Sequence, residues 1–348
     1  MAISVLIKLH RWLGLTLGLW LVLVALTGTL LLYRVELLQL TYPQLQLPQW
    51  PSQQQTALVL DQYTEGYAYM PREANPWLEI VLPDGARHYY NAHGERVLER
   101  PYLGDFVSIM VAFHHHLLLD ELGKDLLGWL GLGALMIAIT GIIRWWPKHW
   151  SRRLVKIRWQ WPWQRGFAGT LFQLHKVAGS LLFVPLIVGL ATGTAIMYAG
   201  AVSKTLELVF PQQQSAPYQP APLAADIKAT TWQQRFDVTA MLYPDLTPQL
   251  ISMSNHSVRL TYPGEWHPNG RSSVTFDAQT GAVLKNYDAR NATLGYALSQ
   301  MVYPVHVAAI GGVSWLVVVL IGGIALMVLP LSGIYFWCWR QYRKRCNL

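Results

Sequence analysis

Four long apolar stretches constrain this chain more than any other feature of its sequence. Each is long enough to cross the roughly 30 Å hydrocarbon core of a bilayer as a helix. Only 13% of the 348 residues are charged, which is about half the usual share in a soluble domain. The sequence therefore predicts a polytopic membrane protein with four helical spans. They run from about His10 to Tyr33, Leu126 to Trp146, His175 to Tyr198 and Val313 to Trp337.

The distribution of charge predicts which side each segment faces. Basic residues gather at the N-terminus, in the segment between spans two and three, and in the C-terminal tail. All acidic residues lie between Glu36 and Asp125 or between Glu207 and Asp288. Because Lys and Arg favour the cytoplasmic side, we expect both termini to be cytoplasmic and the two long loops to lie outside.

These spans divide the chain into eight expected parts. One of them, the basic loop between spans two and three, is also rich in tryptophan. This composition suits an interfacial segment that contacts membrane lipid, and a docking surface for an electron donor is the alternative. The parts are transmembrane helix 1 (1–34), a first outer module (35–105), a lead-in with transmembrane helix 2 (106–147), the basic Trp-rich cytoplasmic loop (148–174), transmembrane helix 3 (175–200), a second outer module (201–295), a lead-in with transmembrane helix 4 (296–339) and a basic cytoplasmic tail (340–348).

Each outer loop contains short β-type runs separated by turn residues. In the first loop, the run from Trp77 to Leu82 is followed by Pro-Asp-Gly and then by a run from Arg87 to Tyr90. In the second loop, the run from Ser273 to Phe276 precedes a turn that ends at Gly281. Such patterns predict strand–turn–strand hairpins, so we expect two small α+β modules.

The chain also repeats itself. A His-x-x-x-Gly motif opens spans one and three, and a Thr-Gly-Thr motif follows each histidine by 17 residues. Spans two and four end in Thr140-Gly141 and Ser332-Gly333. The repeated unit is a span, an outer module and a second span, used twice in the same orientation. Such a pair closes into a four-helix transmembrane bundle with internal duplication.

Four of the eleven histidines occupy duplicated positions at span ends. His10 and His175 open spans one and three on the cytoplasmic side, whereas His114 and His306 precede spans two and four on the other side. Each alone reads as an interfacial histidine, but ionisable residues beside spans usually face the bundle interior. We interpret the four as two ligand pairs, one at each membrane surface. Solvated surface roles are expected for the outer-loop residues His88, His93, His256 and His267.

Haem is the cofactor that these pairs favour. A helical bundle can hold a flat macrocycle between facing helices, and neutral imidazole is a common axial ligand of haem iron. Two histidines per iron suit one-electron transfer rather than O₂ binding. Because the chain has no CxxCH motif, the prediction is two b-type haems. Candidate partners of the haem propionates are Arg11, Arg34, Arg144 and Lys124.

The outer pair has an alternative ligand. Counting back 26 residues from the Thr-Gly and Ser-Gly steps that end spans two and four reaches His114 and His306. Counting forward from the preceding methionines aligns His115 with His306 instead. His114 is the expected outer ligand, and His115 remains the alternate.

Several motifs together resemble the PepSY-associated transmembrane family. They are the HRWLGL opening at His10, the FHHHLLL run from Phe113, the LHKxxG opening of span three and the Thr-Gly span ends. The resemblance covers nearly the whole chain, and it implies that the outer modules are periplasmic PepSY domains of a bacterial inner-membrane protein. Some members are di-haem ferric-siderophore reductases. The resemblance therefore implies an inner haem on His10 and His175 and an outer haem on His114 and His306.

The leading hypothesis is a haem-dependent ferric-siderophore or ferric-chelate reductase, which moves electrons across the membrane and releases iron in the periplasm. No dinucleotide-binding motif occurs in the sequence, so we expect the electron donor to be a quinol or a cytoplasmic reductase. Nucleic acid is not an expected partner. The alternative is a membrane-anchored PepSY regulator or assembly protein of iron uptake without redox activity.

A transporter component is a third hypothesis, and the spans disfavour it. They show no obvious broken-helix pair at mid-membrane, which transporters often use to build a substrate site. Pro185 is the clear interior proline of span three, and we expect it at most to kink that helix.

Overall fold

The computed structural model describes residues 2–73, 75–147, 149, 151, 154, 156–164, 166–212 and 228–346. The chain forms two compact units. The helical unit comprises residues 1–32, 110–199 and 305–348, and the sheet unit comprises residues 33–109 and 200–304. Both halves of the sequence therefore contribute to each unit.

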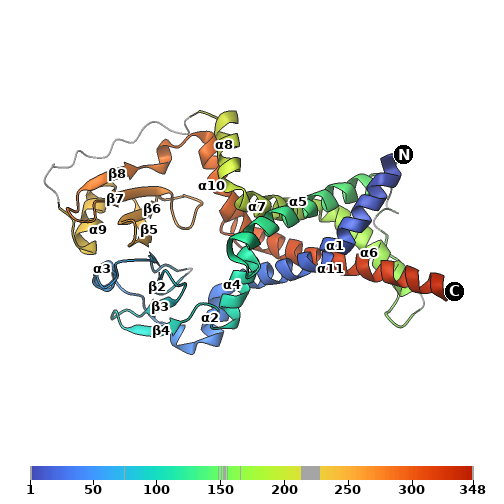
Figure 1. Cartoon of the computed structure of the whole chain (residues 1–348), viewed down its shortest axis with the longest axis horizontal. Helices are drawn as coiled ribbons and strands as arrows, with labels where there is room; N and C mark the ends of the chain where they lie inside the picture. The colour runs from blue at the N-terminus through green and yellow to red at the C-terminus, as the bar shows by residue number, and fades with distance from the viewer. Residues whose placement is uncertain are drawn as a thin grey trace. The chain divides into compact units, whose positions relative to one another are not determined.

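The helical unit is built from three long helices and one bent helix pair. The long helices α1 (Ala2–Leu31), α5 (Asp120–Trp145) and α11 (Gly312–Arg345) are apolar enough to cross a membrane. The pair α6 (Phe167–Leu181) and α7 (Phe183–Met197) adds a fourth span if it is counted as one. Helix α1 packs against α5 and α11, while α7 packs against the same two helices (Figure 1).

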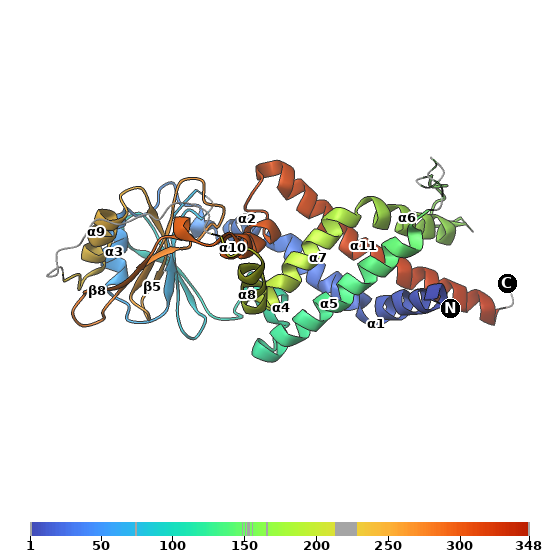
Figure 2. The same cartoon turned by 90° about the horizontal axis from the view of Figure 1, so that it is seen from above.

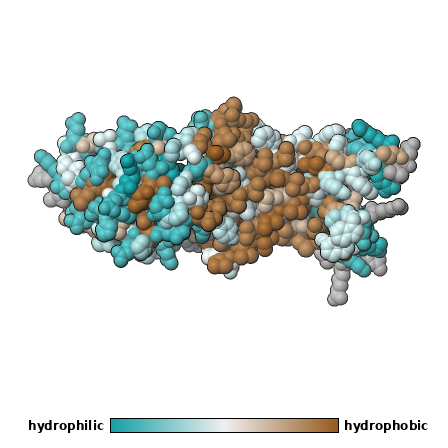
Figure 3. All heavy atoms as spheres, turned by 90° about the horizontal axis from the view of Figure 1, so that it is seen from below, coloured by the Kyte–Doolittle hydropathy of each residue, from teal (hydrophilic) through white to brown (hydrophobic). Residues whose placement is uncertain are grey.

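The surface and the ends of this unit agree with the predicted membrane spans. Large apolar side chains such as Leu19, Trp129 and Ile321 are exposed on the helices, and Figure 3 shows mostly hydrophobic atoms over them. Both chain termini lie at the same end of the helical unit (Figures 1 and 2). These features support a membrane-embedded helical part.

The third span differs from its prediction because it is broken rather than kinked. Helices α6 and α7 are bent by 69° at a break, and Leu182 between them has φ −94° and ψ 12°. Pro185 has no N–H to donate to the carbonyl of Leu181, and its ring crowds that carbonyl. The expectation that the spans contain no broken-helix pair is therefore wrong for residues 167–197.

The remaining helices are short. Helices α4 and α10 continue from the sheet unit into the helical unit. The short helices are α2 (Arg34–Thr41), η1 (Pro43–Leu45), α3 (Gln53–Leu60), α4 (Phe106–His116), α8 (Ala199–Val209), α9 (Trp232–Leu242), η3 (Ala289–Asn291) and α10 (Leu294–His306).

The sheet unit contains one antiparallel sheet of eight strands. Its order is β4-β3-β2-β1-β5-β6-β7-β8, so each half of the chain supplies four neighbouring strands. The predicted hairpins correspond to β2–β3 and β7–β8. The strands are β1 (Tyr67–Tyr69), β2 (Leu78–Val81), β3 (Arg87–Tyr90), β4 (Arg96–Arg100), β5 (Thr247–Ser252), β6 (Ser257–Thr261), β7 (Ser272–Phe276) and β8 (Val283–Tyr287).

The two outer modules expected from the sequence are joined in this sheet. The first strands of the two halves, β1 and β5, pair antiparallel with Ala68 opposite Ile251. Because unpaired strand edges expose backbone hydrogen-bonding groups, this pairing satisfies one edge of each half. The modules are therefore two halves of one sheet rather than separate bodies.

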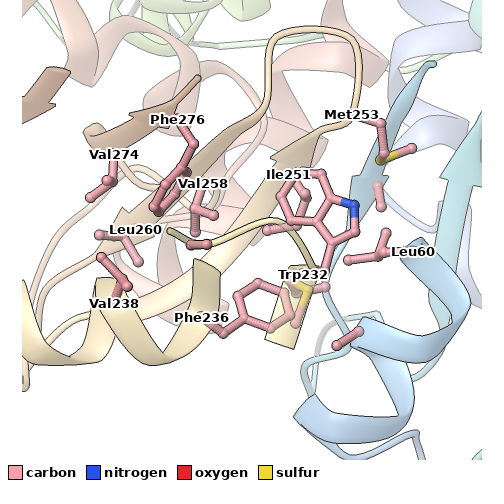
Figure 4. Packing of buried hydrophobic residues seen from close by; sticks show 14 of the residues in the cluster. Leu60, Trp232, Phe236, Val238, Ile251, Met253, Val258, Leu260, Val274 and Phe276 are labelled. Atoms are coloured by element: carbon pink, nitrogen blue, oxygen red, sulfur yellow. The ribbon is translucent and has the colours of Figure 1, made fainter. Parts of the chain in front are cut away.

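One hydrophobic core unites these halves. Helices α3 and α9 pack against each other and contribute Leu60, Trp232 and Phe236 to the core. The sheet contributes Ile251 from β5, and Val258 and Leu260 from alternate positions of β6 (Figure 4). Since side chains alternate along a strand, the residues between these core positions lie on the other face of the sheet.

Candidate cofactor site

His10 and His175 face each other inside the helical unit. His10 lies on α1 and His175 lies on α6. Their ring centres are 6.2 Å apart, and the ring planes are at 88° to each other. Both residues line a cavity of about 550 Å³. The structure thus brings together the two residues predicted as the inner pair, one from each half of the chain.

Helix α5 holds the ring of His10. The Nδ1 atom of His10 lies 3.0 Å from the Ile137 carbonyl oxygen and 3.2 Å from the Thr140 hydroxyl. That hydroxyl donates to the Met136 carbonyl, so it can only accept from the ring. Nδ1 must therefore carry the imidazole proton and donate it. A Cβ atom at Gly141 would lie 3.1 Å from the ring, so glycine leaves room for it.

Helix α11 holds the ring of His175 in the same way. The Nδ1 atom of His175 lies 2.9 Å from the Leu329 carbonyl oxygen and 3.0 Å from the Ser332 hydroxyl. The serine hydroxyl donates to the same carbonyl, so it also accepts from the ring. Gly333 follows, and a Cβ atom there would lie 3.5 Å from the ring.

His114 and His306 form a second pair. His114 lies on α4 and His306 lies on α10. Their ring centres are 6.3 Å apart, and their planes are at 23°. The ring of His115 lies 6.0 Å from that of His114, and His115 is exposed. The structure therefore places His114, rather than the alternate His115, opposite His306.

The ring of His114 is held by α1. Its Nδ1 atom lies 3.0 Å from the Val24 carbonyl oxygen and 3.4 Å from the Thr27 hydroxyl. The threonine donates to the Leu23 carbonyl, which again leaves it as an acceptor. A Cβ atom at Gly28 would overlap the Cε1 atom of His114, so this position requires glycine.

The ring of His306 is held by α7. Its Nδ1 atom lies 3.1 Å from the Thr192 hydroxyl, and the backbone of Gly189 provides a further hydrogen bond. The threonine donates to the Val188 carbonyl. A Cβ atom at Gly193 would lie 3.0 Å from the Cε1 atom of the ring.

One holding arrangement therefore occurs four times, and we call it the histidine seat. A hydroxyl residue, the backbone of the residue three positions before it and the glycine after it hold each ring. Because every seat takes the Nδ1 proton, Nε2 is left with a free lone pair. Metal-binding histidines are usually oriented in this way, with the second nitrogen donating to a carbonyl. The seats are formed by Thr27-Gly28, Thr140-Gly141, Thr192-Gly193 and Ser332-Gly333.

The spacing within each pair fits a shared metal. Two imidazole nitrogens that bind one metal at about 2 Å each place their ring centres about 6 Å apart. The ring centres in the two pairs are 6.2 and 6.3 Å apart. Across the described part of the chain, no group of three or more His, Cys, Asp or Glu residues could hold a metal ion. The pairs thus suit a metal that brings its remaining ligands with it, as haem iron does.

The lining of the inner cavity suits a flat, anionic group such as haem. Its walls include Gly14, Gly18 and Gly179, which leave space beside the rings. Five basic residues and no acidic residue also line it, which suits two propionate groups. These basic residues are Arg11, Arg144, Lys176, Arg340 and Lys344.

Two of the four predicted propionate partners have other partners. Arg11 and Arg144 line the inner cavity, as expected. Arg34, however, lies 2.6 Å from the buried carboxylate of Glu79 in the sheet unit. Lys124 lies 2.5 Å from Glu121 on the same helix.

The histidine seats and the burial of two outer histidines differ from what the sequence predicts. The Thr-Gly and Ser-Gly steps were recognised as repeated span ends, but not as partners of the histidines. The steps do follow a histidine at a constant offset of 17 or 26 residues, but each step holds a different histidine from the one that precedes it. His88 and His267 are 7% and 6% exposed, so the expected solvated surface role is wrong for these two.

Comparison with known proteins agrees with this architecture. A family model described as the PepSY-associated TM region matches residues 7–340. No curated protein matches the chain.

Proposed function

The chain belongs to the PepSY-associated TM region family, and from that premise we propose that it is a di-haem b oxidoreductase of the bacterial inner membrane. In this proposal the protein moves electrons across the membrane to reduce a periplasmic ferric siderophore and release its iron. Both termini are cytoplasmic, and the eight-stranded sheet is periplasmic. The helices form a four-helix transmembrane bundle in which α6 and α7 act as one span.

The observation that carries the proposal is the spacing and orientation of the two histidine pairs. The rings of His10 and His175, and those of His114 and His306, have their centres at a separation that suits one iron, and each ring is held through its Nδ1 atom. A b-type haem bound by each pair supplies reversible one-electron transfer. The seats keep each proton on Nδ1 and fix the ring, so the ligands need little rearrangement between oxidation states.

The distribution of basic residues supports the direction of transfer. The cavity around His10 and His175 is lined by five cations that belong to the basic ends of the helices, and such ends favour the cytoplasmic side. The electron donor, a quinol or a cytoplasmic reductase, loses one electron for each Fe(III) that becomes Fe(II). Because Fe(II) carries less charge, the hard oxygen ligands of a siderophore hold it less tightly.

A direct experiment separates this proposal from a redox-inactive PepSY regulator. The full-length protein is purified in detergent, reduced under anaerobic conditions and mixed with a ferric chelate and a dye specific for Fe(II). The proposal predicts a reduced b-haem spectrum that disappears on mixing, with one Fe(II) formed for each haem oxidised. A colourless protein, or a reduced spectrum that persists with the chelate, would favour the regulator.

A further inference from the structure

The sheet unit contains three arginines that form no ion pair with a described carboxylate. Arg72 follows β1, Arg259 lies in β6 and Arg271 directly precedes β7; we call them the arginine cluster. The side chain of Arg259 lies on the face of the sheet opposite α3 and α9, because its neighbours Val258 and Leu260 both belong to the hydrophobic core.

The guanidinium groups of the arginine cluster donate only to neutral partners among the described residues. Arg72 donates to the amide oxygen of Gln249 at 3.1 Å, to the amide oxygen of Asn269 at 3.2 Å and to a backbone carbonyl. Arg259 donates to the Gly270 carbonyl at 2.7 Å. Among the ion pairs of the described residues, none includes a member of the cluster. The cluster therefore holds three positive charges without a direct counter-charge.

His267 cannot satisfy the donors that surround it. Arg271 Nη2 lies 2.7 Å from His267 Nε2, and the backbone N–H of Asn269 points at Nδ1 from 3.2 Å. A neutral imidazole has only one acceptor nitrogen, so one of these donors meets another N–H. The buried Nε of Arg271 has no hydrogen-bond partner among the described residues either. Oε1 of the nearby Glu265 is also buried without a hydrogen-bond partner among the described residues, so the site holds an unsatisfied donor and an unsatisfied acceptor.

The pKa values reflect the same excess of positive charge. Burial lowers the pKa of Arg72 and Arg259, and burial together with Arg259 lowers the pKa of Arg271 to about 10. Burial and the three guanidinium groups lower the pKa of His267 to about 3. The nearby acid, Glu265, compensates only in part, because burial raises its pKa to about 7.

The corresponding position in the first half of the sheet shows how such charge is normally neutralised. Glu79 lies in β2 between two core residues, as Arg259 does in β6. The Glu79 carboxylate accepts from both Arg34 and Arg87. Although burial opposes it, these two cations lower the pKa of Glu79 to about 2. In the second half Arg259 occupies this position, so no carboxylate lies there.

We propose that the arginine cluster binds the anionic oxygen ligands of a ferric chelate, so that the preferred substrate is a negatively charged carboxylate or catecholate complex. Guanidinium groups bind carboxylates through paired, charge-assisted hydrogen bonds. The cluster is partly accessible, because Arg72, Arg259 and Arg271 are each only half-buried. The inference rests on the proposed reductase function, and it excludes a cationic hydroxamate complex as the preferred substrate.

The test measures binding of ferric citrate to the full-length protein by tryptophan fluorescence, with the variants Arg259→Gln and Arg271→Gln. We expect either substitution to weaken binding by roughly tenfold or more, as for loss of a charged hydrogen bond. Arg96→Gln is the matched control, because Arg96 is exposed and paired with Glu99; its affinity should be unchanged. A cationic trihydroxamate ferric chelate should bind the wild type at least tenfold more weakly than ferric citrate.

Thermal stability distinguishes a binding role from a structural one. Removing a repelled charge should leave the melting temperature of Arg271→Gln unchanged or raise it, and saturating ferric citrate should raise that of the wild type alone by a few degrees. A fall of several degrees, or wild-type affinity in both variants, would overturn the inference.

A further comparison separates the inference from the proposed function. Oxidation of the reduced protein by the cationic chelate but not by ferric citrate would overturn the anion preference and leave the reductase standing. Tight ferric citrate binding without oxidation of the protein would support the anion site and refute the reductase.

Discussion

The inner and the outer histidine pairs are held by the same seats but lie in different surroundings. The inner rings are nearly perpendicular and lie in a cavity with five cations. The outer rings are nearly parallel, and their seat glycines approach the rings more closely. The seats are therefore repeated in both halves of the chain, whereas the ring angle, the nearby charge and the closeness of the glycine differ between the two pairs.

The largest expected effect is the loss of the outer haem in the variant Gly28→Ala. The added Cβ atom would overlap the ring of His114 and turn its Nε2 away from His306. Alanine is favoured over glycine in a helix by about 1 kcal/mol, so the helix itself should persist. We expect the haem content of the purified protein to fall from two to one per chain.

A matched substitution controls this experiment. A Cβ atom at Gly169 on α6 would meet no atom within 4 Å, so Gly169→Ala should retain both haems. Retention of both haems with an unchanged spectrum in Gly28→Ala would mean that the seat does not hold the outer ligand.

The ring orientations predict two different low-spin haem signals. Perpendicular axial imidazoles leave two iron d orbitals nearly equal in energy, whereas parallel rings separate them. The inner pair, at 88°, should therefore give a strongly anisotropic electron paramagnetic resonance signal, and the outer pair, at 23°, a rhombic one. Gly28→Ala should remove only the rhombic signal. Two identical signals from the oxidised wild type would contradict the assignment of the ring planes.

A smaller effect is expected when a cation of the inner cavity is removed. Arg144 lines this cavity, and a nearby positive charge disfavours the oxidised, more positive iron. Arg144→Gln should lower the inner midpoint potential by an amount of the order of 50 mV, since one such charge interaction is worth about 1 kcal/mol. Redox titration should show no change in the outer potential. Lys124→Gln, whose side chain is exposed and paired with Glu121, is the control and should shift neither potential.

The smallest effect is expected for the hydroxyl of a single seat. Ser332→Ala removes one acceptor from His175, but the Leu329 carbonyl remains as its partner. The inner midpoint potential should change by less than about 20 mV, because a neutral hydrogen bond is individually weak. Complete loss of the inner haem in this variant would show that the hydroxyl, and not the carbonyl, orients the ring.

The membrane spans and the paired histidines could be predicted because both leave a pattern in the sequence that does not depend on the folded contacts. Apolar length defines a span, and the duplication aligned His10 with His175 and His114 with His306 by counting alone. The break at Leu182 was missed because a proline in a membrane helix can kink it or end it, and packing decides which. The choice between these outcomes is not encoded in the neighbouring residues.

The joined sheet and the arginine cluster depend on contacts between distant segments. Strand β1 has three residues, too few for an alternating pattern, and the residues of β5 that pair with it lie more than 180 positions further along the chain. Arg72 and Arg259 meet only because these strands pair. A charge excess of this kind becomes visible after folding, since each arginine alone reads as a surface residue.

The central claim is that each histidine pair binds one haem, and the haem content of single-histidine variants tests it most directly. Haem per chain and the reduced-minus-oxidised spectrum are measured for His10→Ala, His175→Ala, His114→Ala and His306→Ala, with His115→Ala as the control. The account predicts two b-type haems in the wild type and in the control, and one in each of the four variants. A wild type without haem, or two haems in any of the four variants, would contradict it.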